Sequence, residues 1–333
     1  MIFPRAGRFR LALLRRDLPV IPMNMLLHHV ALAAPLFALV LVGYVVMRLT
    51  RWSAEVAEAL SSFVFVVALP AMMFRLMCGL SKLPPVDARL LIAFFGSCVI
   101  VFGIGRLVGW KLFGLDGVSQ SVFALGGVFS NNLMLGLPLA KIVLGDAAVP
   151  SVAMVLVFNS LTMWTMVTVS VEWARHGSLS VHGFARTARS VLTNPLILAI
   201  IFGTGIGLTG IELPEVVDIP LGMIAQIATP LSLIALGMGL VQYGVRGGWK
   251  LSGAITFMKL IVQPLVVWAL ARLLGLPPME TRVVVLLGSI ALGVNVYLVA
   301  KQFKALEGPV ASSLVLSTVM AALTTPLVLT LSG

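Results

Sequence analysis

The sequence has 333 residues, of which 59% are hydrophobic and only 11% are charged, and its mean hydropathy is +1.08. A soluble domain carries about 25% charged residues, because water must solvate most of its surface. The composition therefore excludes an ordinary water-soluble fold. It predicts an all-α integral membrane protein that has the lipid bilayer as its solvent.

The formal net charge of +11 raises the question of a nucleic-acid partner. Nucleic-acid-binding domains gather Lys and Arg in one patch or in a recognisable motif. Here the cations stand singly or in small groups between long apolar runs, which is the distribution that orients membrane proteins. We therefore expect no nucleic-acid partner.

The residue types that build metal and catalytic centres are scarce. The two cysteines, Cys78 and Cys98, form neither a disulfide framework nor a metal-binding pair, and the four histidines lie at or beyond the ends of the apolar runs. The sequence contains no recognisable convergent nucleophile or acid–base pair and no G-x-x-x-x-G-K-[ST] nucleotide-binding run. We therefore expect no enzyme, no metal and no cofactor.

Ten apolar runs near or above 18 residues predict ten membrane-spanning helices. These runs are residues 29–47, 55–74, 89–109, 118–143, 148–171, 192–209, 219–242, 251–274, 282–300 and 309–331. The chain then divides into a basic extension over residues 1–24, a first five-helix repeat over 25–172, a cytoplasmic loop over 173–191 and a second five-helix repeat over 192–333.

Matching residues support the division into two repeats. Pro70 and Pro230 lie 160 positions apart, and so do Lys141 and Lys301. An odd number of helices in each repeat gives the two repeats opposite orientations in the bilayer. Inverted repeats, with the substrate site near the midplane at broken helices, are the usual architecture of secondary transporters.

The loop cations predict the orientation. Lys and Arg are more frequent in the odd-numbered loops, which places those loops in the cytoplasm and both termini outside. The arginines of the basic extension oppose this orientation. Two explanations stay open: the native chain begins at Met23 or Met25, or the orientation is reversed. The arginines concerned are Arg5, Arg8, Arg10, Arg15 and Arg16.

The fourth predicted helix contains the strongest functional motif, GGVFSNNLMLGLPLAKIVLG. It is too apolar for a loop, yet Pro138 removes a backbone donor and favours a break. Opened backbone at membrane depth is tolerated only beside protein or a water-filled cavity, and the N-terminus of the second half-helix suits a carboxylate. The alternative is a proline kink in which the asparagines only join helices. The residues concerned are Asn131, Asn132, Gly136 and Pro138.

The ninth predicted helix contains a related motif, GSIALGVNVYLVAK, which has Gly293 and Asn295 but no proline. If helices four and nine cross where each unwinds, Asn132 and Asn295 face one another. The alternative is again an asparagine that only joins helices. Asn159, in the fifth helix, is open to the same two interpretations.

Lys259 is the most unusual charge, because it lies about eight residues into the eighth helix. A cation at that depth costs several kcal/mol and suggests a functional site. We expect its ammonium near the anionic substrate, with snorkelling to the membrane interface as the alternative. Pro70 and Pro230 are expected to break or kink their helices beside the crossing of helices four and nine.

Three segments carry a resemblance to a known family: FSNNLMLGLPLAKIVLG, NPLILAIIFGTGIGLTGIELP and IATPLSLIALGMGL. With them, the chain from about Met25 resembles the auxin efflux carrier family, its malonate-carrier-like bacterial members in particular. The resemblance implies two inverted five-helix repeats with crossed discontinuous helices four and nine, and an elevator-like movement of carboxylate solutes. It places the family's helix-four asparagine and proline at Asn132 and Pro138. Many relatives have proline where this chain has Leu292.

These features together predict a secondary transporter that moves a small organic anion, such as malonate or another dicarboxylate, across the inner membrane. The coupling ion, Na+ or H+, stays open, as does a homodimeric state. One alternative is a sodium- or proton-coupled antiporter of another solute, although such proteins usually need a buried carboxylate. The other is a sensor with a carrier-like fold that does not transport.

Overall fold

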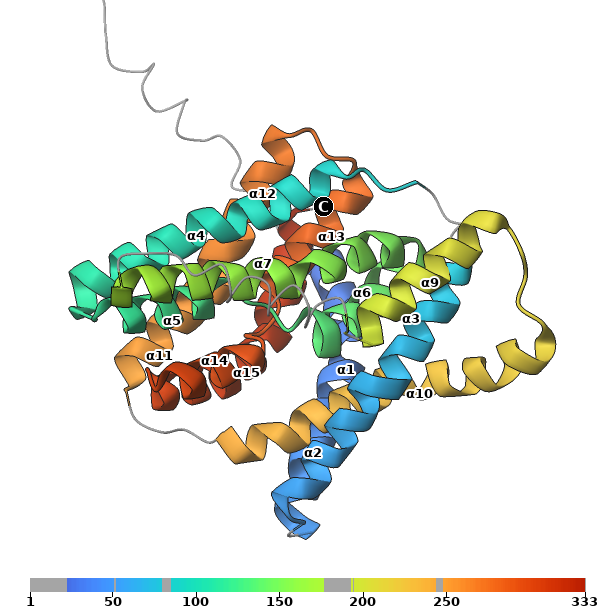
Figure 1. Ribbon diagram of the computed structural model, residues 1–333, viewed down its shortest axis with the longest axis horizontal. Coiled ribbons are helices and arrows are strands. Elements are labelled where there is room, and N and C mark those ends of the chain that lie inside the picture. Colours follow the sequence, from blue (N-terminus) through green and yellow to red (C-terminus); the bar gives the residue numbers. More distant parts are fainter. Residues whose placement is uncertain are drawn as a thin grey trace, which may run out of the picture.

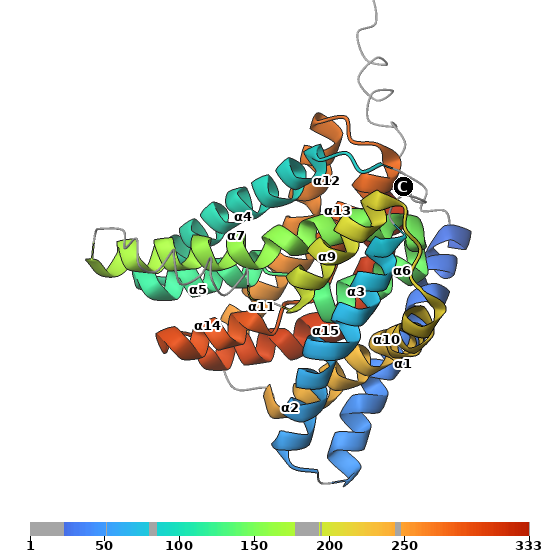
Figure 2. The ribbon, with the colours of Figure 1, turned by 45° about the vertical axis from the view of Figure 1, so that its right-hand side comes forward.

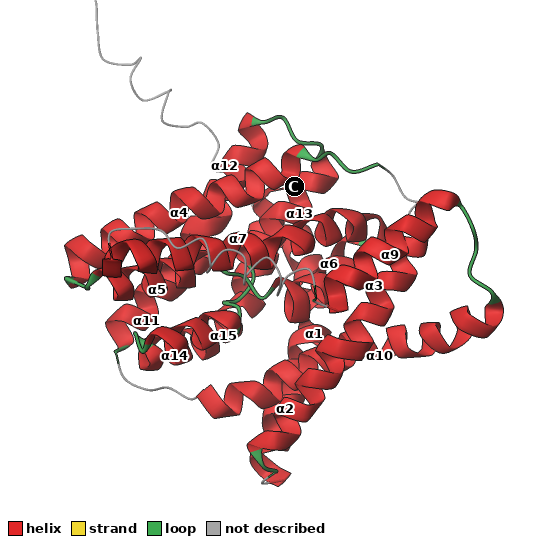
Figure 3. Cartoon of the chain, in the orientation of Figure 1, coloured by secondary structure: helices red, strands yellow, loops and turns green. Residues whose placement is uncertain are grey.

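The computed structural model describes residues 23–50, 52–79, 85–176, 193, 195–243 and 248–332. The arginines of the basic extension and most of the predicted cytoplasmic loop lie outside these ranges. Within them every regular element is a helix, as Figure 3 shows. The all-α fold that the composition predicted is therefore confirmed.

The first half of the chain contains the helices α1 (Met23–Thr50), α2 (Ala54–Phe63), α3 (Leu69–Cys78), α4 (Arg89–Phe113), α5 (Gly117–Val128), α6 (Leu137–Leu144) and α7 (Val149–His176). Three short elements join them: the π-helical turns η1 (Val64–Ala68) and η3 (Asn132–Gly136), and the 3-10 turn η4 (Asp146–Ala148). The second half contains α9 (Pro195–Thr209), α10 (Glu215–Tyr243), α11 (Trp249–Phe257), the π-helical turn η5 (Met258–Val262), α12 (Gln263–Leu273), α13 (Pro278–Ser289), α14 (Asn295–Phe303) and α15 (Glu307–Ser332).

Six helical stretches of the described chain are long and apolar enough to span a membrane. They are Leu26–Thr50, Ala54–Cys78, Arg89–Phe113, Glu215–Gln242, Trp249–Leu273 and Glu307–Ser332. Four shorter apolar helices accompany them: Gly117–Val128, Asn132–Leu144, Asp146–Asn159 and Pro195–Thr209. The protein is therefore a multi-pass membrane protein.

The helices form two groups. In both Figure 1 and Figure 2, α2, α3, α9 and α10 lie on one side and α4, α5, α11 and α14 on the other. In the first helix group, α1 packs along α10, and α3 packs on α9 and α10. In the second helix group, α4 packs on α5 and α12, while α11 and α13 pack on α15. The groups meet where α1 contacts α15 and α6, where α10 contacts α15 and η3, and where α9 and α3 contact α7.

Each π-helical turn of the described chain ends two residues before a proline: Pro70, Pro138 and Pro264. Proline lacks an N–H and its ring clashes with the carbonyl four residues earlier. The wider π turn accommodates that carbonyl while the helix continues.

Pro230 behaves differently, because α10 continues through it as one helix. The helix therefore does not break at Pro230, and the kink expected there stays a prediction. A proline removes one backbone hydrogen bond and crowds the carbonyl four residues earlier, and the packing of α1, α2 and α3 against α10 offsets this cost. A hydroxyl group also bonds to the backbone next to Pro230: Ser232 Oγ donates to the Thr229 carbonyl at 2.8 Å.

Two glycines allow α1 and α10 to approach closely. A Cβ atom at Gly237 would collide with the Val40 carbonyl, and one at Gly43 would collide with the Ile234 carbonyl. Small residues at such contacts are the usual means by which membrane helices gain close packing.

We expect Gly237→Ala to destabilise the protein by about 1–3 kcal/mol, because backbone rather than a movable side chain blocks the new methyl group. Thermal unfolding of detergent-purified protein measures this. Gly103→Ala is the matched control, since nothing lies within 4 Å of its added Cβ and alanine favours a helix. Equal melting temperatures for the two variants would contradict the packing role of Gly237.

Candidate functional site

The chain unwinds at two places in the second helix group. One lies between the end of α5 at Val128 and the start of η3 at Asn132, and the other between the end of α13 at Ser289 and the start of α14 at Asn295. Both interruptions fall within the motifs that predicted them.

The two unwound segments pair with each other. Ser130 and Leu292 form an isolated antiparallel bridge. The Asn131 N–H donates to the Ala291 carbonyl at 3.0 Å, and the Gly293 N–H donates to the Phe129 carbonyl at 2.8 Å. Each segment therefore satisfies backbone groups that the other exposes, as a non-helical segment at membrane depth requires.

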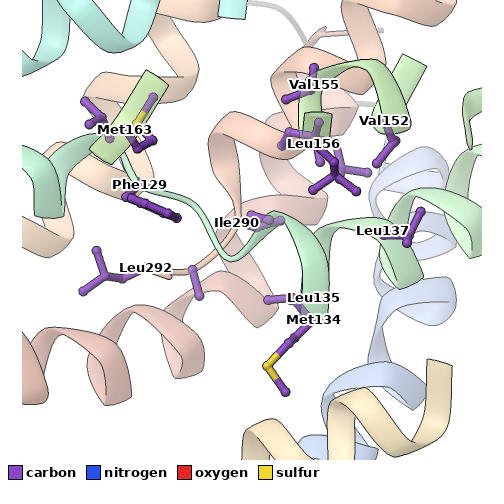
Figure 4. Packing of buried hydrophobic residues seen from close by; sticks show 14 of the residues in the cluster. Phe129, Met134, Leu135, Leu137, Val152, Val155, Leu156, Met163, Ile290 and Leu292 are labelled. Carbon is purple, nitrogen blue, oxygen red and sulfur yellow. The ribbon is translucent and has the colours of Figure 1, made fainter. Parts of the chain in front are cut away.

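Close packing surrounds this pairing. Figure 4 shows the stretch after Phe129 passing the stretch that carries Ile290 and Leu292, all three of which are buried. A Cβ atom at Gly293 would lie 2.9 Å from the Phe129 ring and 3.1 Å from the Ser130 carbonyl. Glycine at 293 is thus required by the approach of the partner backbone.

The second interruption forms without a proline. The Leu292 N–H, which a proline would lack, donates to Ser317 Oγ of α15 at 3.1 Å. The family pattern that places proline here is therefore not needed to open the helix, because a hydroxyl from another helix satisfies the freed donor.

A cavity of about 310 Å³ lies beside the paired segments. Its lining includes four of the six residues that the sequence singled out in the unwound motifs: Asn131, Asn132, Gly293 and Asn295. Ser130 and Asn159 also line it, as do Phe65, Leu196 and Ile197 from the first helix group. The cavity therefore lies between the two groups. Its volume is at the small end of the range for ligand pockets.

The polar side chains of this cavity are incompletely bonded. Asn132 Nδ2 donates to Asn159 Oδ1 at 3.2 Å, and Asn131 Oδ1 accepts from the Met134 N–H at 3.3 Å. These bonds leave Asn131 Nδ2, Asn132 Oδ1 and Ser130 Oγ buried without a protein partner. Buried polar groups are normally paired, so unpaired ones that line a cavity indicate a polar ligand or water.

The backbone gives the cavity a positive character. Two helical segments begin at its wall, one at Asn132 and one at Asn295. A helix N-terminus carries unpaired N–H groups and the positive end of the helix dipole, and two of them converge here. None of the lining residues is charged. The site is therefore suited to an anion held by amides and dipoles.

The structure places Lys259 elsewhere. Its side chain is fully buried but does not line the cavity, and its Nζ donates to the Gly288 carbonyl at 2.5 Å. The predicted cluster of Lys259 with Asn132 and Asn295 is therefore not present in this conformation. Snorkelling is excluded as well, because the ammonium is enclosed by protein.

The helix-breaking residues support the site from outside the cavity. Gly136 ends η3, and a Cβ there would lie 2.8 Å from Ile290 Cδ1, so it allows close packing on the second segment. Pro138 follows in α6 and is buried, and Pro70 lies at the start of α3. Sequence reasoning missed Phe65, Leu196 and Ile197, because apolar side chains that line a cavity resemble those that pack or face lipid.

Comparison with known proteins places the chain in a family of membrane transporters. Residues 28–329 match the family model described as a membrane transport protein. The chain therefore belongs to this family, that of the auxin efflux carriers, as the motifs indicated. A curated protein of Rhizobium meliloti (strain 1021), named "Putative malonate transporter", is 24% identical over 296 residues, which cover 88% of this chain and 92% of that protein. Both names describe transporters rather than enzymes.

We expect Ser317→Ala to destabilise the protein by about 1–3 kcal/mol, because it leaves the buried Leu292 N–H without an acceptor. With Leu292→Pro already present, Ser317→Ala should cost much less, since proline has no N–H to satisfy. Melting temperatures of the two single variants and the double variant measure this coupling. Thr318→Val is the control, because its hydroxyl bonds only within its own helix. Fully additive losses would contradict the role of Ser317.

Proposed function

We propose that the protein is a secondary transporter of a small organic anion, with its binding site in the cavity beside the paired segments. The supporting observation is that two helix N-termini and the unpartnered Nδ2 of Asn131 lie at one small cavity whose described lining is uncharged. Carboxylates are the common biological anions of this size. Malonate or a related dicarboxylate is the first candidate, because the curated relative is named for malonate.

We also propose that ten membrane spans form two inverted five-helix repeats. The order of elements supports this, since α1, α2–α3, α4, α5–α6 and α7 correspond to α9, α10, α11–α12, α13–α14 and α15. The third unit of each half matches most closely: α4 begins at Arg89 and α11 at Trp249, 160 residues apart, and α4 and α12 end at the same interval. Five spans in each repeat reverse the second repeat in the bilayer.

The position of the cavity suggests an elevator-like mechanism. The second helix group supplies its polar wall, while the first group contributes the apolar side chains of Phe65, Leu196 and Ile197. Apolar contacts at the cavity have no directional bonds to break, which favours movement of the second group along the first with the anion attached. Such a movement would have to break two hydrogen bonds that join the groups, from Ser232 Oγ to the Met134 carbonyl at 3.2 Å and between His29 Nδ1 and Thr330 Oγ1 at 2.9 Å. The inner membrane, with both termini outside, is the proposed location on the basis of the loop cations.

The alternative antiporter function gains no support from the described residues. No carboxylate lines the cavity, so proton exchange there lacks the usual titratable group. The sensor alternative predicts binding without movement of the anion, and a counterflow assay separates the two.

We expect purified protein in liposomes to exchange labelled malonate, malate or another small carboxylate for the same unlabelled anion inside. Counterflow needs no coupling gradient, so it tests the substrate class alone. Failure of every carboxylate in the panel to exchange would refute transport of this class. Saturable binding without exchange would favour a sensor.

We expect Asn132→Ala and Asn295→Ala each to weaken binding of the transported carboxylate by about 10- to 100-fold, because each removes a polar group beside a buried anion. Asn24→Ala is the matched control, since Asn24 is exposed at the start of α1. Affinity is measured by calorimetry on folded, monodisperse protein. Unchanged affinity in both cavity variants would remove these residues from the site.

A further inference from the structure

Lys259 is a buried lysine whose ammonium lies at the C-terminal end of another helix, α13. It lies in η5, within the apolar stretch Trp249–Leu273, and its side chain is completely enclosed. Its Nζ donates to the carbonyl of Gly288, the residue before the last of α13. The ammonium therefore lies at the C-terminal end of α13, where the helix dipole is negative.

No carboxylate neutralises this ammonium among the described residues. Their ion pairs are Arg75–Asp218, Arg89–Asp87 and Lys141–Asp146, all near the ends of spans. A buried charge normally requires a partner or a metal site. At Lys259 the negative potential comes from a backbone carbonyl and the half-helix end.

Two buried side-chain oxygens lie on the same helix as Lys259, one turn to either side of it, and neither is hydrogen-bonded to the ammonium. Thr256 and Gln263 lie one turn before and one turn after Lys259, and both are buried. Thr256 Oγ1 and Gln263 Oε1 have no partner. The Gln263 amide nitrogen donates to Ser97 Oγ at 3.1 Å, which fixes the orientation of the amide group. An ammonium has three donors, and Gly288 uses one of them.

A carbonyl at a half-helix C-terminus and neutral side-chain oxygens are the groups that bind Na+ in many secondary transporters. Here a covalently attached ammonium already occupies that carbonyl. We propose that Lys259 is a tethered cation that takes the place of a free coupling Na+, so that this carrier works without sodium. This proposal rests on the proposed transport function.

The tethered cation also positions the anion site. Gly288, which Lys259 binds, lies directly before the unwound segment that carries Gly293 and Asn295. By bonding the end of α13, Lys259 fixes where that segment leaves the helix. Lys259 is thus a positioning residue that does not touch the anion.

The first test uses the unaltered protein. Its melting temperature and its counterflow rate are measured in Na+ and in choline at equal ionic strength. We expect both to agree in the two salts, the rates within twofold. A sodium-dependent rise in melting temperature, or uptake that requires Na+, would overturn the proposal. The melting measurement needs no substrate, so it decides the question even if no carboxylate is transported and the proposed function fails.

The second test removes the tether. Lys259→Ala leaves a space beside the Gly288 carbonyl, so we expect it to lose at least tenfold in counterflow and to regain stability and activity with added ethylammonium or Na+. Lys259→Met is the matched control, because its side chain fills the space and should allow no rescue.

Full activity of Lys259→Ala without any added cation would overturn the proposal, and so would equal rescue of both variants. If neither variant folds, the salt comparison on the unaltered protein still decides.

Discussion

The structure depends on one constraint, which is that backbone N–H and C=O groups at membrane depth must find partners within the protein. Opening a single helix in hydrocarbon would leave several such groups unpaired, at a cost of several kcal/mol for each. Here two helices open at the same place and pair through Asn131, Ala291, Gly293 and Phe129. Each opening is tolerated because the other exists.

The same constraint shapes the proposed binding site. A helix that resumes after an interruption presents a new N-terminus inside the protein, whereas an unbroken helix presents its N-terminus only at the membrane surface. The segments that begin at Asn132 and Asn295 both start at the cavity wall, so the unwinding supplies positive potential without a charged side chain. For a carrier this is an advantage. An anion paired with a buried cation would be released slowly, since Coulomb attraction is strong at low dielectric, while amides and dipoles bind it more weakly.

The sequence predicted the local features of the site better than the long-range ones. Asn131, Asn132 and Pro138 indicated the first interruption, because a proline and short polar side chains act on backbone within a few residues of them. The pairing of the two interruptions followed from their equivalent places in the two halves. The cavity lining by Asn295 could then be predicted from that correspondence.

Pro230 and Lys259 show where such reasoning fails. Whether a proline breaks a helix depends on what packs around it, and α10 is held continuous by neighbours that are distant in the sequence. The partner of Lys259 is a backbone carbonyl 29 residues away. Because every residue has a backbone carbonyl, the sequence does not indicate which one bonds a given side chain. The sequence offered no carboxylate at the depth of Lys259, so the expected partner of its ammonium was the anionic substrate.

The two halves reach the same backbone opening by different chemistry. The first interruption has an asparagine side chain that caps η3 and a proline two residues after that turn. The second has neither in its half-helix, and instead uses Ser317 to bond the freed Leu292 N–H and Lys259 to bond the end of α13. A repeat can therefore retain its architecture while its side chains diverge, because what must be preserved is the pairing of the backbone groups. That freedom is seen in the second half, where a buried lysine bonds the end of the half-helix.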